Sequence, residues 1–324
     1  MPAEPTVFLG DFGGTHLRLA IRGDQGPSQI EVYKVAEWSG IGDVLRDYAL
    51  RTGTHYKDAS LYLSHTGHIV DGGLTLHYKE TRPWSFRLED VRAEFALARL
   101  DAVNDLKAAA YAVLHTGVDV FEPLRTGIDD GSNALVLGLG TGIGHAYLDR
   151  RARISTETYG GHFPATTVTE RQRALADIIR AGLATGRSFI AEDILSGEGL
   201  MRLYRAMAAY TKTQAQAKTV HDLIPLKDVD PLVRMSTSAF CEFLGIHANI
   251  LCTAPHAYGG IYLCGGLFDR LMDADLFDFD AFTANLHQNM VPVVAHSLEN
   301  APIFAAKVEH ASLYGLDVYA GAIV

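Results

Sequence analysis

One pattern occurs twice in this chain, and it limits the possible folds more than any other feature. Residues 9–20 read LGDFGGTHLRLA, and residues 137–148 read LGLGTGIGHAYL. Each copy places a glycine-rich turn between two apolar runs, which is typical of two antiparallel strands joined by a tight turn. A further strand pattern follows each copy, at 30–35 and at 153–158, and helical patterning comes after it. The repeat predicts two related α/β halves.

The first turn, Gly13-Gly14-Thr15, carries chemistry as well as geometry. Two adjacent glycines at a hairpin turn predict unusual backbone angles. Such a turn can direct several backbone N–H groups at an anion, and the nearby carboxylate of Asp11 could hold a metal ion that carries the same anion. A nucleotide phosphate satisfies both features.

Composition excludes several classes of protein. A chain of 324 residues favours two domains over one. The net charge of −10 argues against nucleic acid or an acidic membrane as the partner and favours a small molecule. No apolar run is long enough to cross a bilayer, and the start MPAEPT lacks a signal-peptide pattern, so we expect a cytoplasmic protein. The three separated cysteines predict reduced thiols in the core: Cys241, Cys252 and Cys264.

A third glycine turn lies in GGIYLCGGLFDRL, where an apolar strand pattern at 261–264 meets Gly265-Gly266 and then a helix pattern. Any one such turn is consistent with a plain tight turn. The sequence has no G-x-x-x-x-G-K-[ST] motif, and its alternating glycines at 138–144 do not follow G-x-G-x-x-G spacing. It also lacks an HRD motif to pair with the DFG at 11–13, so neither a Rossmann oxidoreductase nor a protein kinase is favoured.

Taken together, these motifs resemble those of the bacterial hexokinase-type glucokinases, within the actin-like ATPase superfamily. GDFGGTHLRLA is similar to that family's first phosphate motif, GLGTGIGHAYL to its second, and YLCGGLFDRL to its adenosine segment. Further similar segments are VND at 103–105, YGGH at 159–162 and AEDILSGEGLMRLY from residue 191. The resemblance covers nearly the whole chain. The cysteine-rich zinc motif of the related repressor-kinase group is absent from the sequence.

The resemblance implies an α/β fold of the two-domain, ribonuclease H-like type, with mixed sheets flanked by helices and an active-site cleft between the domains. We expect a small domain over 1–113, to which the segment 311–324 returns, and a large domain over 114–310. The likeness also implies ATP and Mg²⁺ as cofactors, a sugar as the substrate and a homodimer as the assembly.

The resemblance assigns roles to named residues. Asp105 is expected to accept the proton of the sugar hydroxyl under attack, although Asn104-Asp105 before an alanine-rich run also fits simple helix capping. Asp11 is expected near Mg²⁺ and the terminal phosphates. The expected nucleotide-binding residues are Asp11, Gly13, Gly14, Thr15, Gly140, Thr141, Gly142, Gly265 and Gly266. Arg18 fits a solvated strand face and is given no role.

The expected sugar ligands are Asn104, Asp105, His162 and Glu192, and next to them the chain departs from the family pattern. Where the family carries a glutamate immediately before GGH, this chain has Tyr159, with Glu157 two residues earlier. The loop could shift so that Glu157 reaches the sugar, Tyr159 could face the pocket, or Tyr159 could pack outward. Because a phenol accepts fewer hydrogen bonds than a carboxylate, we expect altered or weakened glucose recognition.

The leading hypothesis is ATP-dependent phosphorylation of a hexose hydroxyl, with glucose converted to glucose 6-phosphate. One alternative is a kinase of a different sugar, because of Tyr159. Another is a non-catalytic sugar-binding regulatory protein of the same fold, and a third is a cytoskeletal or chaperone-type ATPase of the superfamily.

Overall fold

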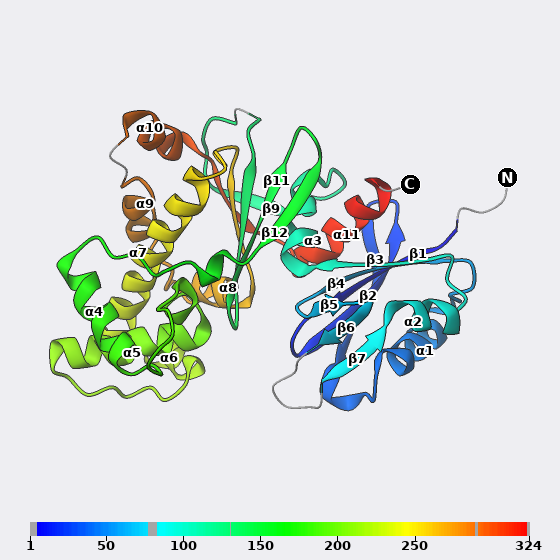
Figure 1. Ribbon diagram of the computed structural model, residues 1–324, viewed down its shortest axis with the longest axis horizontal. Helices are drawn as coiled ribbons and strands as arrows, with labels where there is room; N and C mark the ends of the chain where they lie inside the picture. The colour runs from blue at the N-terminus through cyan, green and yellow to red at the C-terminus, as the bar shows by residue number, and fades with distance from the viewer. Residues whose placement is uncertain (1–4, 77–82, 130, 289–290, 323–324) are drawn as a thin grey trace. The chain divides into compact units, whose positions relative to one another are not determined.

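The computed structural model describes residues 5–76, 83–129, 131–288 and 291–322 (Figure 1). The chain divides into two compact units. Unit 1 comprises Met1–Phe121, Arg153–Glu157 and Lys307–Val324, and unit 2 comprises Glu122–Ala152 and Thr158–Ala306. The sequence patterns placed the corresponding boundaries at 113/114 and 310/311. Within the domain ranges expected from the sequence, residues 1–4, 77–82, 130, 289–290 and 323–324 lie outside the described part of the chain.

The main sheet of unit 1 runs in the order β3-β2-β1-β4-β8. Its strands are β1 (Val7–Phe12), β2 (His16–Gly23), β3 (Gly26–Lys34), β4 (Ser60–His65) and β8 (Arg99–Asn104). The hairpin strands β1, β2 and β3 pair antiparallel, whereas β1 with β4 and β4 with β8 are parallel. The parallel pairs bring the carboxyl ends of β1, β4 and β8 to one edge.

A small antiparallel sheet in the order β5-β6-β7 also belongs to unit 1. Its strands are β5 (His68–Val70), β6 (Gly73–Leu76) and β7 (Trp84–Arg87). The helices of unit 1 are α1 (Ile41–Thr52), α2 (Leu88–Glu94), α3 (Asp105–Tyr111) and α11 (Ala311–Ala322), with 3₁₀ turns η1 (Val35–Glu37) and η2 (Ala112–Leu114).

Strand β1 divides its side chains between two cores, because alternate residues of a strand point to opposite faces. Phe8 and Phe12 belong to the core under α1 and α2. Leu9 belongs instead to the core under α3 and α11. Figure 1 shows these helix pairs on opposite faces of the sheet. Asp11 shares the parity of Leu9, so its carboxylate faces the α3 side.

The sheet of unit 2 runs in the order β12-β11-β10-β13-β14-β9. Its strands are β9 (Phe121–Arg125), β10 (Ala134–Leu139), β11 (Ile143–Asp149), β12 (Ile154–Thr158), β13 (Ile261–Cys264) and β14 (Ile303–Ala306). Strands β10 and β11 form an antiparallel hairpin, and β13 lies parallel to both β10 and β14. Residues 154–157 of β12 are counted with unit 1, together with Arg153 before them.

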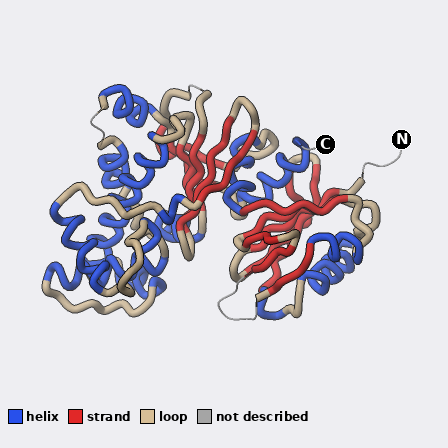
Figure 2. The backbone as a smooth tube through the Cα atoms, in the orientation of Figure 1, coloured by secondary structure: helices blue, strands red, loops and turns tan. Residues whose placement is uncertain are grey.

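Helix α5 of unit 2 packs against α4, α6 and α7 in a bundle (Figure 2). The long α7 also packs against α9, and its apolar face is almost entirely buried. The helices of the unit are α4 (Glu170–Ala181), α5 (Gly197–Thr211), α6 (Val220–Leu226), α7 (Pro231–Thr253), α8 (Gly266–Asp273), α9 (Phe279–Leu286) and α10 (Pro292–Asn300). Its 3₁₀ turns are η3 (Gly160–His162) and η4 (Ala191–Asp193).

Both copies of the repeated motif form the hairpins that the sequence predicted, β1–β2 and β10–β11. The prediction of unusual backbone angles in the first turn is wrong, because neither Gly13 nor Gly14 has a φ in the left-handed region. A Cβ on Gly14 would meet nothing within 4 Å, so glycine leaves the outer surface of the turn open.

The cysteine prediction is confirmed, since all three cysteines are buried and none forms a disulfide within the described part of the chain. In the described part of the chain, no helix has the length and apolar character that a membrane span requires.

Candidate active site

Asp11 lies at the end of β1 and is held by two side chains from the neighbouring strands. The hydroxyl of Ser64 donates to Asp11 Oδ1 at 2.6 Å, and Nη1 of Arg18 lies 3.2 Å from Oδ2. The strand register dictates both contacts, because Asp11 stands directly opposite Ser64 on β4 and Arg18 on β2. Only 8% of Asp11 is exposed. The carboxylate is therefore fixed in direction before any ligand arrives.

Asn104 and Asp105 stand where β8 ends and α3 begins. Asn104 Oδ1 accepts hydrogen bonds from the N–H groups of Leu106 and Lys107, at 2.9 and 3.3 Å. Asp105 Oδ1 accepts from Leu106 at 2.9 Å. Asn104 therefore caps the helix, as its residue type favours. Asp105 therefore stands half-buried in the first turn of α3, next to the cap.

Burial and the neighbouring carboxylate of Asp11 raise the pKa of Asp105 to about 7. Desolvation disfavours the charged carboxylate, and repulsion from Asp11 adds to that effect. The hydrogen bond from Leu106 acts in the opposite direction but does not cancel it. A carboxylate with a pKa near neutrality is suited to accept a proton from a hydroxyl at physiological pH.

Glu157 lies beside the same helix terminus in unit 1. Its Oε2 is 3.4 Å from Nζ of Lys107, in the first turn of α3. Its charge also acts on His65, which ends β4 beside Asn104 and whose pKa is lowered mainly by burial. Unit 1 therefore brings Glu157 together with Asn104, Asp105 and Asp11.

The turn at Gly13–Thr15 is closed by backbone hydrogen bonds at its ends. The N–H of Gly13 donates to the carbonyl of His16 at 3.1 Å, and the carbonyl of Thr15 accepts from Val35 at 3.1 Å. Within the described part of the chain, the N–H of Gly14 donates to no protein group. The turn thus presents an exposed backbone donor beside Asp11.

The second glycine turn, Gly140–Gly142, lies in unit 2 against Glu192. The N–H of Ile143 donates to Glu192 Oε2 at 3.2 Å. The N–H groups of Thr141 and Gly142 have no acceptor among the described residues. Glu192 is carried by η4, and its neighbour Asp193 is held by the guanidinium groups of Arg187 and Arg202.

His162 ends η3, a turn that packs tightly on the sheet below it. A Cβ on Gly160 would lie 1.7 Å from the ring of His145, so only glycine fits there. The buried imidazole of His145 contacts the hydroxyl of Thr158. Tyr159 is 80% exposed, with its ring centre 5.9 Å from that of His162.

Gly265 and Gly266 connect β13 to α8 and lie next to the second glycine turn. Gly265 has a φ of 101°, and a Cβ there would lie 2.5 Å from the carbonyl oxygen of Leu139. Packing against β10 is therefore a sufficient reason for glycine at 265. A Cβ on Gly266 would meet nothing within 4 Å, so the start of α8 is open at that residue.

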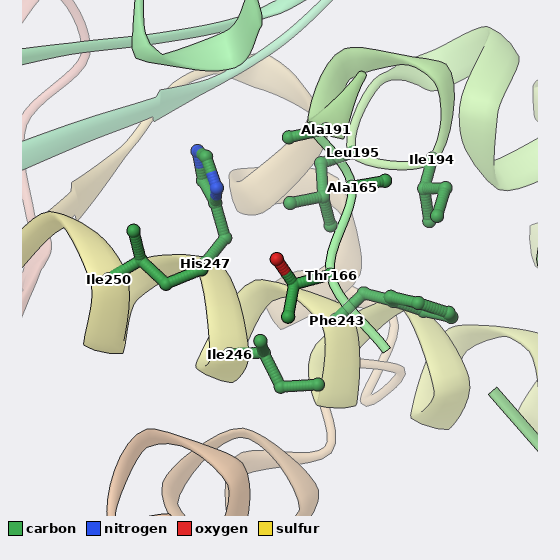
Figure 3. A pocket seen from close by; sticks show the side chains of 9 residues that line it. All are labelled: Ala165, Thr166, Ala191, Ile194, Leu195, Phe243, Ile246, His247 and Ile250. Carbon is green, nitrogen blue, oxygen red and sulfur yellow. The ribbon is translucent and has the colours of Figure 1, made fainter. Parts of the chain in front are cut away.

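A pocket lies behind the loop that carries His162, between that loop, η4 and α7 (Figure 3). Its lining is mostly apolar and comprises Ala165, Thr166, Ala191, Ile194, Leu195, Phe243, Ile246, His247 and Ile250. The space left free inside it is about 10 Å³, which is room for about one water molecule. Ligand pockets usually enclose roughly 300 Å³ or more and offer convergent polar groups. This space is therefore a packing gap under the loop and not a sugar site.

Three residues near Asp11 and Asp105 were missed by the sequence analysis. Arg18 was interpreted as a solvated residue, yet it pairs with Asp11. No role was expected for Ser64 or Lys107, yet Ser64 contacts Asp11 and Lys107 contacts Glu157. The hairpin register was the available signal for Arg18, since counting outward from the turn places it opposite Asp11.

A single carboxylate is available for a metal ion at the first turn. Among the described residues, no group of three or more His, Cys, Asp or Glu side chains could hold a metal. Mg²⁺ usually keeps several waters and is held by one or two carboxylates together with substrate phosphates. Asp11 beside the turn that is open at Gly14 fits that mode of binding.

Comparison with known families and sequences gives one consistent answer. A family model described as Glucokinase matches residues 8–322. The glucokinase of Saccharophagus degradans is 28% identical over 320 residues, which cover 95% of this chain and 96% of that protein. The glucokinase of Paramagnetospirillum magneticum is 30% identical over 281 residues, covering 83% and 84% of the two chains.

Crystal structures with the same fold lead to the same group of proteins. A glucokinase from an Antarctic psychrotroph superposes with a TM-score of 0.85 at 23% identity, covering 98% of this chain and 99% of its own. A ROK family glucokinase from Streptomyces griseus, crystallised with glucose and AMPPNP, gives a TM-score of 0.63 at 16% identity, covering 97% and 98%. The expected two-domain actin-like ATPase fold is confirmed.

Proposed function

The chain belongs to the glucokinase family, and we propose that it transfers the terminal phosphoryl group of ATP to the 6-hydroxyl of glucose. The observation that carries this proposal is Asp105, a carboxylate at the start of α3 whose pKa is raised to about 7. No observation favours a different sugar or a non-catalytic regulatory role.

Asp105 accepts the proton of the attacking hydroxyl. As the hydroxyl oxygen forms its bond to the γ-phosphorus, the bond between that phosphorus and the oxygen bridging to the β-phosphate breaks, and ADP leaves with its electron pair. Because the transition state of phosphoryl transfer is loose, positioning and charge stabilisation supply most of the catalysis. The carboxylate orients the hydroxyl and takes its proton, an effect typically worth about a hundredfold or more.

The glycine turns hold the nucleotide. Backbone N–H groups of Gly14, Thr141 and Gly142 are free to donate to phosphate oxygens. Gly265 and Gly266 are assigned to the adenosine side, where the open start of α8 leaves room for a ligand. Asp11 would help to hold Mg²⁺ at the first turn. When bound, the metal would neutralise the charge that develops on the phosphates.

Sugar recognition is assigned to Asn104, Asp105, Glu157, His162 and Glu192. We assign the carboxylate that the family carries before GGH to Glu157 in this chain. The support is its position, since it lies against Lys107 on the same helix as Asp105. Tyr159 is 80% exposed within its unit and is given no hydrogen-bonding role. Glucose therefore remains the substrate despite the exchanged residue.

The proposal extends to a homodimer that acts in the cytoplasm, which rests on the family resemblance alone. Light scattering of the purified protein measures whether its mass is that of one chain or two.

A coupled assay of ADP release over a panel of hexoses tests the activity. We expect glucose to stimulate ADP release and mass spectrometry to detect glucose 6-phosphate, with Asp105→Asn as the inactive control. Absence of sugar-stimulated ADP release with every hexose would overturn the proposal. A better substrate than glucose elsewhere on the panel would overturn the assignment of glucose but not of the reaction.

A further inference from the structure

The turn assigned to phosphate and a residue assigned to sugar are in direct contact within unit 2. Glu192 Oε2 accepts a hydrogen bond from the N–H of Ile143, the residue immediately after the turn. A Cβ on Gly142 would lie 2.4 Å from that same oxygen. The carboxylate therefore occupies the space beside the turn, and a side chain at 142 would displace it.

The segment that carries Glu192 makes a backbone hydrogen bond to the Gly140–Gly142 turn at one end and another to the loop of His162 at the other end. The N–H of Gly197 donates to the carbonyl of Gly140 at 3.0 Å. The N–H of Ala191 donates to the carbonyl of Phe163 at 2.8 Å, just after His162. Residues 191–197 thus join the loop of His162 to the phosphate turn.

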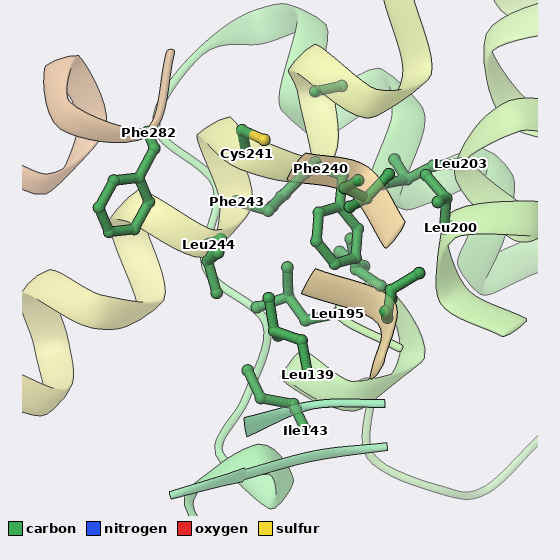
Figure 4. Close-up of a cluster of buried hydrophobic side chains, with 14 of the residues drawn as sticks. Leu139, Ile143, Leu195, Leu200, Leu203, Phe240, Cys241, Phe243, Leu244 and Phe282 are labelled. Atoms are coloured by element: carbon green, nitrogen blue, oxygen red, sulfur yellow. The ribbon is translucent and has the colours of Figure 1, made fainter. Parts of the chain in front are cut away.

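Packing leaves this connection little freedom to deform. Leu139 and Ile143, on either side of the turn, point into the core together with Leu195, as Figure 4 shows. All three side chains are at most 5% exposed. Because protein interiors are close-packed, a shift of Glu192 is transmitted to its neighbours and is not absorbed by them.

We infer that Glu192 is a positioning residue for the phosphate turn in addition to its role toward the sugar, so that the two substrates bind cooperatively through it. This inference rests on the proposed function. A sugar hydroxyl that donates to Glu192 fixes the carboxylate against Ile143, and an ordered turn in return fixes the carboxylate for the sugar. Thermodynamic linkage requires the effect to be the same in both directions.

Nucleotide binding without sugar separates this role from simple sugar contact. We measure the affinity for AMPPNP with Mg²⁺ by calorimetry, in the absence of any hexose. Glu192→Ala should bind AMPPNP about fivefold or more weakly, within the usual range of coupling. Glu192→Gln keeps an oxygen that accepts from Ile143, so its nucleotide affinity should stay near that of the unmodified protein. Equal affinities for all three proteins would overturn the inference.

Two glycines of the turn give a matched test in the opposite direction, in which the phosphate turn is changed and glucose binding is measured. Gly142→Ala places a methyl group against Glu192 and should raise the KM for glucose. Gly140→Ala, whose Cβ would meet nothing within 4 Å and so would not displace Glu192, should raise the KM for glucose less than Gly142→Ala does. Neither glycine has a φ in the left-handed region, so alanine brings no backbone strain at either residue.

The same KM for glucose in both glycine variants, with folding confirmed by thermal melts, would overturn the coupling. The calorimetric arm needs no turnover. Loss of the proposed function would therefore appear as absent phosphorylation by the unmodified protein, and loss of the coupling as unchanged nucleotide affinity in Glu192→Ala.

Discussion

The carboxylate of Asp11 faces Asp105 from the end of the neighbouring β1, and its charge is one of the two causes of the raised pKa of Asp105. Ser64 and Arg18 hold Asp11 in place, while the N–H of Leu106 fixes one oxygen of Asp105. Two carboxylates in one site thus differ in environment, and this difference is a common way to separate a proton acceptor from an electrostatic partner.

Replacing Asp105 by asparagine should abolish turnover and preserve the fold. The amide has nearly the same shape but accepts no proton, so we expect kcat to fall about a hundredfold or more. Steady-state kinetics with glucose measure the effect, and circular dichroism with AMPPNP binding provides the control for folding. Retention of more than a tenth of the activity would remove Asp105 from the catalytic role.

The same substitution should stabilise the protein at alkaline pH. The pKa of Asp105 is about 7 in the folded protein and 3.8 for an unperturbed carboxyl, so the folded state binds the extra proton between those values. The contribution of Asp105 to stability is therefore full below about pH 4 and is lost as the pH rises through 7. Melting temperatures should show Asp105→Asn above the unmodified protein at pH 8, with the gap shrinking at pH 5. An equal gap at both pH values would contradict the raised pKa.

Activity should fall on the acid side of neutrality. The base form of Asp105 is depleted below about pH 7, so kcat/KM for glucose should decrease tenfold per pH unit there. A pH–rate profile over pH 5 to 9, with the coupling enzymes in excess, measures this decrease of kcat/KM on the acid side. A flat profile down to pH 5 would mean that Asp105 is already ionised throughout that range.

Glu157 and Tyr159 should respond in opposite ways to substitution. Loss of one hydrogen bond to a charged group costs about 1.5 to 3 kcal/mol, so Glu157→Ala should raise the KM for glucose roughly ten- to a hundredfold. Tyr159→Glu should leave that KM nearly unchanged, because Tyr159 is largely exposed. Lys107→Met, which removes the partner of Glu157, should raise the KM less than Glu157→Ala does. Improved glucose turnover in Tyr159→Glu, with no effect of Glu157→Ala, would transfer the role to position 159.

His247 should make the protein sensitive to acid. Burial, together with a smaller effect of His145, lowers its pKa from 6.5 to about 4, so the unfolded chain takes up a proton first as the pH falls. Stability is then full above pH 6.5 and is lost as the pH falls toward 4, by about 3 kcal/mol at most, at about 1.4 kcal/mol per pH unit. Urea unfolding at pH 7 and pH 5 should show a smaller loss for His247→Gln than for the unmodified protein.

The order of strands, turns and helices was readable from local patterns. The repeated strand-turn-strand motif predicted both hairpins, and the strand, glycine pair and helix at 261–273 form as expected. These features depend on alternation, helical periodicity and turn residues, which are properties of adjacent residues. The resemblance to the glucokinases added the fold and the roles of residues far apart in the chain.

What only the tertiary structure decided is which side chains meet across strands and helices. Arg18 and Ser64 converge on Asp11 because of strand register, and Glu192 meets Ile143 because η4 packs on the hairpin turn. Gly13 and Gly14 show that local sequence can also mislead, because both have ordinary backbone angles. Their surroundings differ: a Cβ on Gly13 would lie 3.2 Å from the carbonyl oxygen of His16, whereas one on Gly14 would meet nothing within 4 Å. Local sequence determines which elements form, but contacts between elements depend on packing among residues that no periodicity connects, and the charge of Asp105 depends on those contacts.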